Sequence, residues 1–522
     1  MKRETMEKVT ILWADDEIDL LKPHILFLRE KGYDVYTTNN GDDAIDILKT
    51  RPFDIVFLDE QMPGLSGIET LSLIKNSFPN LPVVMITKSE EESIMEDAIG
   101  TNISDYLIKP VNPKQILLSL KKNLENKKLI SEKTTFAYQQ QFRQLGLEIS
   151  NNLTFVEWTE VYKKIVYWEL ELEKSHDEGI IEVMKMQKEE ANQVFTRFVE
   201  NNYIDWLNGR VKDKPVQSHT LMKEKIFPLL DESPGLFFIL IDNLRYDQWK
   251  VLQPILEEYY RVEKDELYYS ILPTTTQYAR NALFSGLMPT EIEKKYPNYW
   301  VNEDEEGTKN QFESELLGEQ LKRFNRDIKY SYTKVLSLTA GRKLVENLPN
   351  LMVNKFNVIV YNFVDMLSHA RTEMDVIREL ADDEPAYRSL TLQWFEHSPL
   401  FDVIKFLAEK KINIVISTDH GSVRVNNPVK VIGDKNTNTN LRYKTGKSLN
   451  YNKKEVFEVR NPADVFLPRG NMSSSYIFCR RADFFAYPNN YNYYANYYRN
   501  TFQHGGLSME EMMVPIAFLK AK

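Results

Sequence analysis

Acidic and histidine side chains follow three apolar segments in the second half of this 522-residue sequence. LFFILI ends at Asp242, NVIVYNF ends just before Asp365, and INIVIST is followed by Asp419 and His420. Such segments are typical of buried parallel strands, whose carboxyl ends meet at one edge of a sheet. We therefore expect these side chains to lie close together, and they are residue types that bind metal ions.

Two further histidines have settings that suit metal binding. His369 stands four residues after Asp365, so on a helical turn both side chains project to one face. His504 lies in QHGGLS, where paired glycines allow the backbone to pass close to a site. Only seven residues are histidine, so three in such settings are not independent accidents. Two zinc-like ions about 4 Å apart can bind both the attacking and the leaving oxygen of a phosphoryl transfer. The side chains that suit such a pair of ions are Asp242, Asp365, His369, Asp419, His420 and His504.

A nucleophile for such a site is available in ILPTTTQYARNALFSGLMP, which contains the threonine run Thr274, Thr275 and Thr276. A free threonine hydroxyl is a poor nucleophile, and metal coordination is one way to ionise it at neutral pH. The alternative is a threonine-rich turn that caps a helix.

A second set of reactive residues lies in the first 122 residues, again at the ends of apolar segments. The first segment ends at Asp15 and Asp16, the third at Asp59, the fourth at Thr87, and the fifth before Lys109. Converging carboxylates repel one another, and hard oxygen ligands suit Mg²⁺. Solvated loop acids and a surface lysine would explain any one of these residues, but not all four segment ends.

The elements that must position these groups alternate between short strands and amphipathic helices. We predict strands at 9–13, 34–38, 54–58, 83–87 and 105–108, and hence a five-stranded doubly wound domain over residues 1–122. This part holds 14 Lys and Arg against 21 Asp and Glu, so it carries −7 of the net charge of −10.

The blocks ILWADDE, FLDEQMPGLSGIE, MITK and YLIKP make this domain resemble the flavodoxin-like (βα)5 receiver domains of response regulators. The resemblance implies that Asp59 accepts a phosphoryl group and that Asp15, Asp16 and Asp59 bind one Mg²⁺. It also implies that Thr87, Tyr106 and Lys109 form the switch, and that a sensor histidine kinase is the partner.

Residues 123–230 are expected to form a helical connector. Glycine is sparse and proline absent between 123 and 208, and TFVE at 154–157 reads as a capping box. The connector could be a spacer, or it could relay a signal or dimerise. It contains no convincing helix-turn-helix, which makes a DNA-binding output the weaker hypothesis.

Composition excludes several classes of protein. Hydrophobic residues make up 42% and charged residues 27%, which argues against global disorder and against a generally basic nucleic-acid binder. Cys479 is the only cysteine, so an intramolecular disulfide and a cysteine zinc finger are excluded. No export signal or membrane-spanning run is visible, so we expect a soluble cytoplasmic protein without membrane insertion.

The blocks IDNLRYD, PTTTQYARNALFSGLMP, VDMLSH, STDHG and QHGGLSMEEMMVPI make residues 231–522 resemble the PglZ-type branch of the alkaline phosphatase superfamily, with an α/β/α fold. The resemblance implies one zinc held by Asp242, Thr276, Asp419 and His420, and another held by Asp365, His369 and His504. Thr276 is the preferred nucleophile because its spacing to Gly286 matches the family's block, with Thr274 and Thr275 as alternatives. Arg280 is the expected contact to a substrate phosphate.

Two features bear on the substrate. Residues 427–460 hold eight Lys and Arg against three acids, which could attract an oligonucleotide or could be a solvated basic loop. The run YPNNYNYYANYYRN at 487–500 offers aromatic faces for base stacking, although tyrosines that cover an irregular loop would read the same way.

The three parts together form a multidomain α/β chain that resembles the PorX-type response regulators associated with type IX protein secretion. The resemblance implies a receiver that controls a zinc-dependent phosphodiesterase. We expect a phosphodiester substrate, which could be a linear or cyclic oligonucleotide, and a phosphorylation-promoted homodimer; the physiological substrate stays open. The competing hypothesis is a non-catalytic zinc-containing scaffold that docks a transcription or secretion partner. The sign of the regulation and the identity of the kinase stay open.

Overall fold

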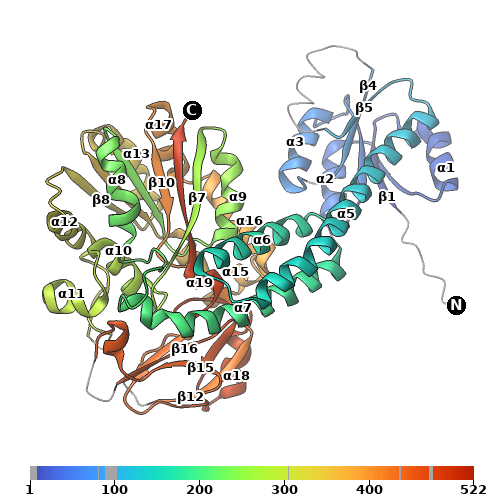
Figure 1. The fold of residues 1–522 in the computed structure, drawn as a ribbon. Coiled ribbons are helices and arrows are strands. Elements are labelled where there is room, and N and C mark those ends of the chain that lie inside the picture. The colour runs from blue at the N-terminus through green and yellow to red at the C-terminus, as the bar shows by residue number, and fades with distance from the viewer. Residues whose placement is uncertain are drawn as a thin grey trace. The chain divides into compact units, whose positions relative to one another are not determined.

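The computed structural model describes residues 9–79, 81–88, 103–175, 177–303, 305–433, 437–469 and 474–522 (Figure 1). The chain divides into two compact units, Met1–Tyr138 with Lys174–Asp177, and Gln139–Glu173 with Glu178–Lys522. In the described part of the chain, no helix is both long and apolar enough to cross a membrane.

The first unit contains the expected five-stranded parallel sheet, in the order β2-β1-β3-β4-β5. Its strands are β1 (Thr10–Ala14), β2 (Asp34–Thr38), β3 (Ile55–Asp59), β4 (Val83–Thr87) and β5 (Asp105–Ile108). Its helices are α1 (Lys22–Glu30), α2 (Gly41–Thr50), α3 (Gly67–Ser77) and the first part of α5 (Pro113–Ser150). The predicted doubly wound fold is therefore confirmed, and α5 runs without a break through residue 122.

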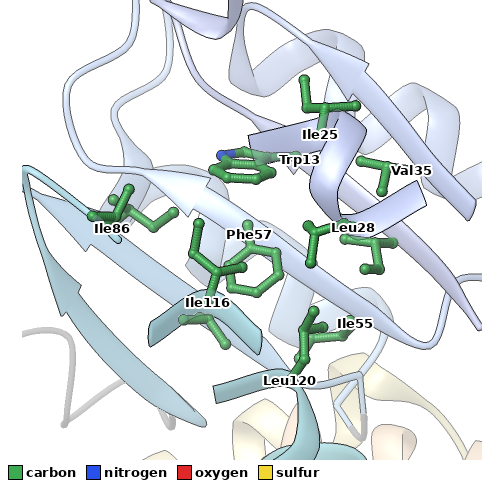
Figure 2. Packing of buried hydrophobic residues seen from close by; sticks show 12 residues of the cluster. Trp13, Ile25, Leu28, Val35, Ile55, Phe57, Ile86, Ile116 and Leu120 are labelled. Atoms are coloured by element: carbon green, nitrogen blue, oxygen red, sulfur yellow. The ribbon is translucent and has the colours of Figure 1, made fainter. Parts of the chain in front are cut away.

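Alternation along the buried strands gives this sheet a core on each face. Trp13 and Phe57 pack with ring centroids 5.3 Å apart on the face that α1 and α5 cover, as Figure 2 shows. Leu12 and Leu58, one position away in each strand, belong to the core on the other face. This two-sided burial keeps the strand ends, and the polar residues that follow them, in fixed positions.

The connector helices α6 (Phe155–Glu173) and α7 (Glu178–Leu207) pack against each other in the second unit. The predicted capping box is present, because the Thr154 amide donates to Glu157 Oε2 at 2.8 Å and the Glu157 amide donates to Thr154 Oγ1 at 3.3 Å. Trp158 is buried and its ring lies 5.4 Å from Phe195 and 6.0 Å from Phe198.

Buried polar contacts join the connector to the C-terminal domain. Asn192 of α7 donates to Glu510 Oε2 at 3.0 Å and accepts from the Met509 amide at 2.8 Å. The Tyr203 hydroxyl accepts from the Leu272 amide at 2.8 Å. A spacer would have no such contacts, so these helices are part of the body of the C-terminal domain.

The C-terminal domain is built on a six-stranded sheet in the order β7-β19-β10-β6-β9-β8. The strands are β6 (Leu236–Ile241), β7 (Tyr260–Tyr269), β8 (Tyr330–Val335), β9 (Phe356–Tyr361), β10 (Ile414–Ser417) and β19 (Met513–Ala521). β10, β6, β9 and β8 run parallel, whereas β19 is antiparallel to β10 and β7. The predicted α/β architecture is confirmed, with the three predicted strands β6, β9 and β10 as direct neighbours.

Helices surround this sheet and connect its strands (Figure 1). They are α8 (Phe227–Glu232), α9 (Tyr246–Leu256), α10 (Asn281–Ser285), α11 (Pro289–Lys295), α12 (Glu313–Arg323), α13 (Leu338–Leu351), α14 (Phe363–Glu373), α15 (Asp375–Leu380), α16 (Glu384–Glu396), α17 (Pro399–Glu409) and α19 (Met509–Met512).

Small sheets with α18 (Tyr491–Tyr498) occupy one end of the domain, as Figure 1 shows. Their strands are β11 (Val423–Arg424), β12 (Asn427–Ile432), β13 (Tyr443–Gly446), β14 (Asn450–Tyr451), β15 (Val456–Val459), β16 (Ser475–Cys479), β17 (Asp483–Ala486) and β18 (Phe502–Gln503).

Part of residues 427–460 is β-structure, so the segment is not a single loop, although most of its described cations are exposed. Arg442 is fully buried and donates to Glu511 Oε2 from Nη2 at 2.6 Å. Lys444 is buried as well, its Nζ donates to the Asn438 carbonyl at 2.8 Å, and burial lowers its pKa to about 8. Lys435 lies outside the described residues. At least two of the eight cations are thus unavailable to a substrate.

We predict that Trp158→Ala destabilises the second unit by about 3–5 kcal/mol, because it empties a buried aromatic site between α6 and α7. Calorimetric unfolding of the full chain should show a lower transition temperature for that unit. Val156→Ala is the matched control in the same helix, since its side chain is 54% exposed and should change stability by less than about 0.5 kcal/mol. Equal transition temperatures for the two variants would contradict the packing described here.

Candidate functional site

The residues expected to bind metal converge at the carboxyl edge of the six-stranded sheet. Asp242 follows β6 directly, Asp419 and His420 follow β10, and Asp365 lies in the first turn of α14 after β9. Because β10, β6 and β9 are adjacent and parallel, their ends meet at one edge. The predicted convergence from distant parts of the sequence is thus present in the fold.

Asp242, Asp419 and His420 form a first group whose ligand atoms all lie within 4.8 Å of one another. His420 Nε2 is 3.7 Å from Asp242 Oδ1 and 3.7 Å from Asp419 Oδ2. The Thr276 hydroxyl oxygen lies 3.1 Å from His420 Nε2 and 3.4 Å from Asp242 Oδ1. This places Thr276 at the first group, where the resemblance had assigned it.

Asp365, His369 and His504 form a second group within the same 4.8 Å limit. His369 Nε2 is 3.6 Å from Asp365 Oδ2, and His504 Nε2 is 3.4 Å from Asp365 Oδ1. The two groups adjoin, because the rings of His420 and His504 are stacked with centroids 4.4 Å apart. Together they make one site with two places for a cation.

Hydrogen bonds distinguish the three threonines of the run. Thr274 Oγ1 donates to the Gly506 carbonyl at 2.9 Å and accepts from the Gly505 amide at 3.0 Å, so it fastens the loop that carries His504. Thr275 Oγ1 is buried and has no hydrogen-bond partner among the described residues. Of the three hydroxyls, that of Thr276 lies at the first Asp/His group.

The paired glycines after His504 do allow a close backbone approach, as the sequence suggested. Gly505 has φ +120°, and a Cβ at Gly506 would lie 2.8 Å from both Arg442 Nη2 and the Cys479 carbonyl. The Gly506 amide also donates to Glu511 at 2.8 Å. These contacts hold the loop between the buried Arg442–Glu511 pair and the threonine run.

The electrostatics of the site are compatible with bound cations. Burial raises the pKa of Asp242 well above its ordinary value, and the charges of Asp419 and Asp365 act in the same direction against Arg280. Burial lowers the pKa of His420 to about 4, so this ring is neutral at pH 7, as a metal ligand must be. Asp419 Oδ2 is buried without a hydrogen-bond partner among the described residues. Such an orphaned carboxylate oxygen fits a metal ligand.

Arg280 has a different environment from the one expected of a phosphate contact. It is fully buried, Nη1 donates to Asp242 Oδ2 at 2.8 Å, and Nε donates to Glu313 Oε1 at 2.5 Å. Arg280 therefore orients Asp242. Its Nη2 is buried without a hydrogen-bond partner among the described residues, so the contact to a substrate phosphate stays a prediction. Glu313, at the start of α12, was missed because nothing near it in the sequence indicates this long-range partner.

Asn243 was also missed. Its side-chain Nδ2 lies 3.4 Å from Asp365 Oδ1, and its backbone nitrogen lies 3.5 Å from Asp419 Oδ1. Asn243 therefore bridges the two groups. Its φ is +64°, a left-handed conformation that asparagine tolerates better than most residues. An asparagine directly after a strand-end aspartate is the sequence signal that could have indicated this turn.

A buried ion network extends from the site to the connector. Arg245, three residues after Asp242, donates to Asp247 Oδ1 from Nε at 2.9 Å. Arg388 binds Asp247 at 2.9 Å and Glu169 of α6 at 3.0 Å. The acids of this network are thus bound by guanidinium groups, which argues against a third metal site here.

The receiver site is assembled at the carboxyl edge of the first sheet. Asp15, Asp16 and Asp59 have ligand oxygens within 4.8 Å of one another. Lys109 Nζ lies 3.0 Å from Asp15 Oδ2 and 2.8 Å from Asp59 Oδ1. Burial raises the pKa of Asp59 to about 6, with the hydrogen bond from Lys109 opposing the shift. The three acids can hold one divalent cation, and Asp59 can approach a phosphoryl donor.

The two other predicted switch residues occupy neighbouring strands. Thr87 ends β4, is buried, and its hydroxyl donates to Glu60. Tyr106 is half-buried on β5 and packs against the core that contains Leu12 and Leu58. Residues 89–102, which follow Thr87, lie outside the described part of the chain.

Three family models match the chain in succession. The response regulator receiver domain matches residues 11–121, and the PorX response regulator linker domain matches residues 128–207. The BREX system PglZ alkaline phosphatase-like domain matches residues 221–518.

Curated relatives are similar over a shorter part of the chain. Transcriptional regulatory protein ZraR of Klebsiella oxytoca is 33% identical over 155 residues, which are 29% of this chain and 35% of ZraR. Alginate biosynthesis transcriptional regulatory protein AlgB of Pseudomonas syringae pv. tomato is 32% identical over 129 residues, which are 25% of this chain and 29% of AlgB. The chain therefore spans about a third of the length of these relatives.

Solved receiver structures are similar as well. The CheY-like receiver domain protein of Methanospirillum hungatei JF-1 has 22% identity and a TM-score of 0.23, over 23% of this chain and 96% of that one. The NtrX receiver domain of Brucella abortus has 32% identity and a TM-score of 0.21, over 22% of this chain and 98% of that one. Because the PglZ model spans more than half of the sequence and follows the receiver and PorX linker models, the chain belongs to the PglZ alkaline-phosphatase-like family, in the arrangement of the PorX-type response regulators.

Proposed function

We propose that this chain is a response regulator whose C-terminal domain is a two-zinc phosphodiesterase with Thr276 as its nucleophile. The observation that carries the proposal is the position of the Thr276 hydroxyl, 3.1 Å from His420 Nε2 at the first of two adjoining Asp/His groups. Mixed oxygen and nitrogen ligands of this kind suit zinc, and two adjoining sites suit phosphoryl transfer.

The residues fit the two ions in the allocation that the resemblance implied. Asp242, Asp419, His420 and the Thr276 hydroxyl would hold one zinc, and Asp365, His369 and His504 would hold the other. Bound zinc would favour ionisation of the Thr276 hydroxyl and offset the charge on the phosphate oxygens.

The chain's own residues account for the remaining steps. Thr276 Oγ attacks phosphorus and its proton passes to water. The bond from phosphorus to the leaving oxygen breaks, that oxygen takes a proton from water and departs as an alcohol, and a phosphothreonine forms. Water then attacks the same phosphorus, the bond to Thr276 Oγ breaks, and the threonine hydroxyl is restored as phosphate monoester leaves. Arg280 and Asn243 keep the carboxylates in place throughout.

We further propose that a sensor histidine kinase phosphorylates Asp59, with one Mg²⁺ held by Asp15, Asp16 and Asp59. The connector supports control of the catalytic domain, since the Tyr203 hydroxyl binds the amide of Leu272, four residues before Thr276. The network through Arg388 and Asp247 also joins α6 to the turn after Asp242. Phosphorylation would promote a homodimer in the cytoplasm, and the PorX arrangement supports a role in regulating type IX protein secretion.

We predict that Thr276→Val abolishes hydrolysis of bis-p-nitrophenyl phosphate and of short linear or cyclic oligonucleotides, because it removes the attacking oxygen while keeping the shape of the side chain. Zinc content and melting temperature should stay nearly unchanged. Thr275→Val is the matched control, and it should retain activity, because the Thr275 hydroxyl has no partner among the described residues to lose.

Undiminished turnover by Thr276→Val would refute the assigned nucleophile. A wild-type chain that carries zinc but hydrolyses no diester would instead support the alternative function, a zinc-containing scaffold that docks a transcription or secretion partner.

We predict that Asp59→Asn removes every response to acetyl phosphate, because the amide cannot form the acyl phosphate. The wild-type chain should change both its dimer fraction, measured by light scattering, and its diesterase rate on phosphorylation. Asp46→Asn is the control, since Asp46 is an exposed residue of α2 that pairs with Lys49. A full response in Asp59→Asn, or none in the wild type, would contradict receiver control.

A further inference from the structure

The tyrosine-rich segment is a helix with an open aromatic face. The sequence also allowed an irregular loop here, but the structure has the helix α18, with the sequence YNYYANYY. The rings of Tyr493 and Tyr497 are nearly parallel, with centroids 6.0 Å apart and planes at 15°, and those of Tyr494 and Tyr498 are 6.2 Å apart at 14°. Tyr493 is 64% exposed and Tyr494 40%, whereas Ala495 is buried. The helix therefore buries its alanine and presents rows of aromatic rings to solvent.

Positive groups border this face. Lys430 Nζ lies 4.8 Å from the centre of the Tyr491 ring, and the guanidinium of Arg378 lies 5.2 Å from that of Tyr497. Arg499 follows the helix directly and is exposed. A face that combines flat aromatic rings with cations complements a strand of bases joined by phosphates.

Further guanidinium groups lie beneath the same region. Arg371 and Arg424 both donate to the Asp382 carbonyl, which bears no charge to cancel theirs. Arg371 is buried, and Glu384 of the same region is paired with Arg245. The side chains of Asp382 and Asp383 are exposed, so these acids offset part of the positive charge.

The aromatic face borders the zinc-type site. The Tyr497 hydroxyl donates to the Thr372 carbonyl at 3.1 Å, and Gln503 Nε2 donates to Thr372 Oγ1 at 3.4 Å. Thr372 lies three residues after His369 on α14, about 4.5 Å along the helix axis. The His369 side chain is 61% exposed, which marks the open side of the site.

We propose that α18 is a base-stacking platform for single-stranded nucleic acid, and that it holds the strand whose phosphodiester reaches Thr276. Bases would stack on Tyr493 and Tyr494, and the intervening phosphates would lie near Lys430, Arg378 and Arg499. This inference rests on the proposed phosphodiesterase function, to which it adds a binding surface for a single-stranded oligonucleotide. Stacking on rings and pairing of phosphates with cations are sequence-tolerant, so no base preference is required.

The test measures binding separately from hydrolysis. The full chain carrying Thr276→Val is titrated into fluorescein-labelled oligothymidylate of twelve nucleotides, and fluorescence anisotropy gives the Kd at fixed salt. Adding Tyr493→Leu and Tyr494→Leu should weaken binding about tenfold or more, given the stacking contribution of one base on one ring. Replacing both tyrosines with phenylalanine should preserve it. Tyr167→Leu, a similarly exposed tyrosine of α6 at 56%, should leave the Kd unchanged.

A second variant tests the phosphate contacts independently of the rings. Lys430→Gln should reduce the slope of log Kd against log salt by about 0.7, the value for one phosphate contact to a single strand. Unchanged Kd in the double leucine variant, or an equal loss in Tyr167→Leu, would overturn the platform. Failure of the Thr276→Val chain to bind the oligonucleotide, while the wild-type chain hydrolyses bis-p-nitrophenyl phosphate, would overturn the platform alone. Ring-dependent binding without hydrolysis of any diester would support the platform and refute the proposed function.

Discussion

The convergence of three carboxylates at one sheet edge, two of them fully buried, is the constraint on which the C-terminal domain depends. Asp242, Asp365 and Asp419 come from three adjacent strand ends, and water is excluded from two of them completely. Three neighbouring carboxyl groups in a poorly solvated site cannot all ionise without compensating positive charge. Arg280 supplies one positive charge, and the neutral His420 supplies none. Two bound zinc ions would more than offset the remaining negative charge, and they would also create the chemistry proposed for Thr276.

The same constraint explains how the connector is used. A site that depends on exact carboxylate positions is sensitive to the elements that support its loops, and α6 and α7 are among them. Asn192 donates a hydrogen bond to Glu510 of α19, and the Tyr203 hydroxyl accepts one from the Leu272 amide, just before the threonine run. Glu169 of α6 accepts a hydrogen bond from Arg388, which belongs to the buried ion network. Since α5 continues from the receiver into this unit, a change in the receiver has a covalent route to these supports.

The sequence predicts that these acidic and histidine side chains lie together, because strand ends of a parallel sheet must converge, and this rule needs no long-range information. Choosing Thr276 over Thr274 from the residues alone was not possible, because the choice depends on hydrogen bonds to Gly505 and Gly506 more than 200 residues away. The burial of Arg442 depends likewise on Glu511. Helix α18 could not be predicted from the sequence, because tyrosine and asparagine have low helix propensity and packing decides the conformation of this segment.

Metal content measured on the purified full chain tests the central claim most directly. Native mass spectrometry should find two zinc ions per chain in the wild type. Asp365→Ala, which removes the carboxylate shared by His369 and His504, should leave one zinc, because the group of Asp242, Asp419 and His420 is separate. A wild-type chain without zinc, or an Asp365→Ala chain that still holds two ions, would contradict the account.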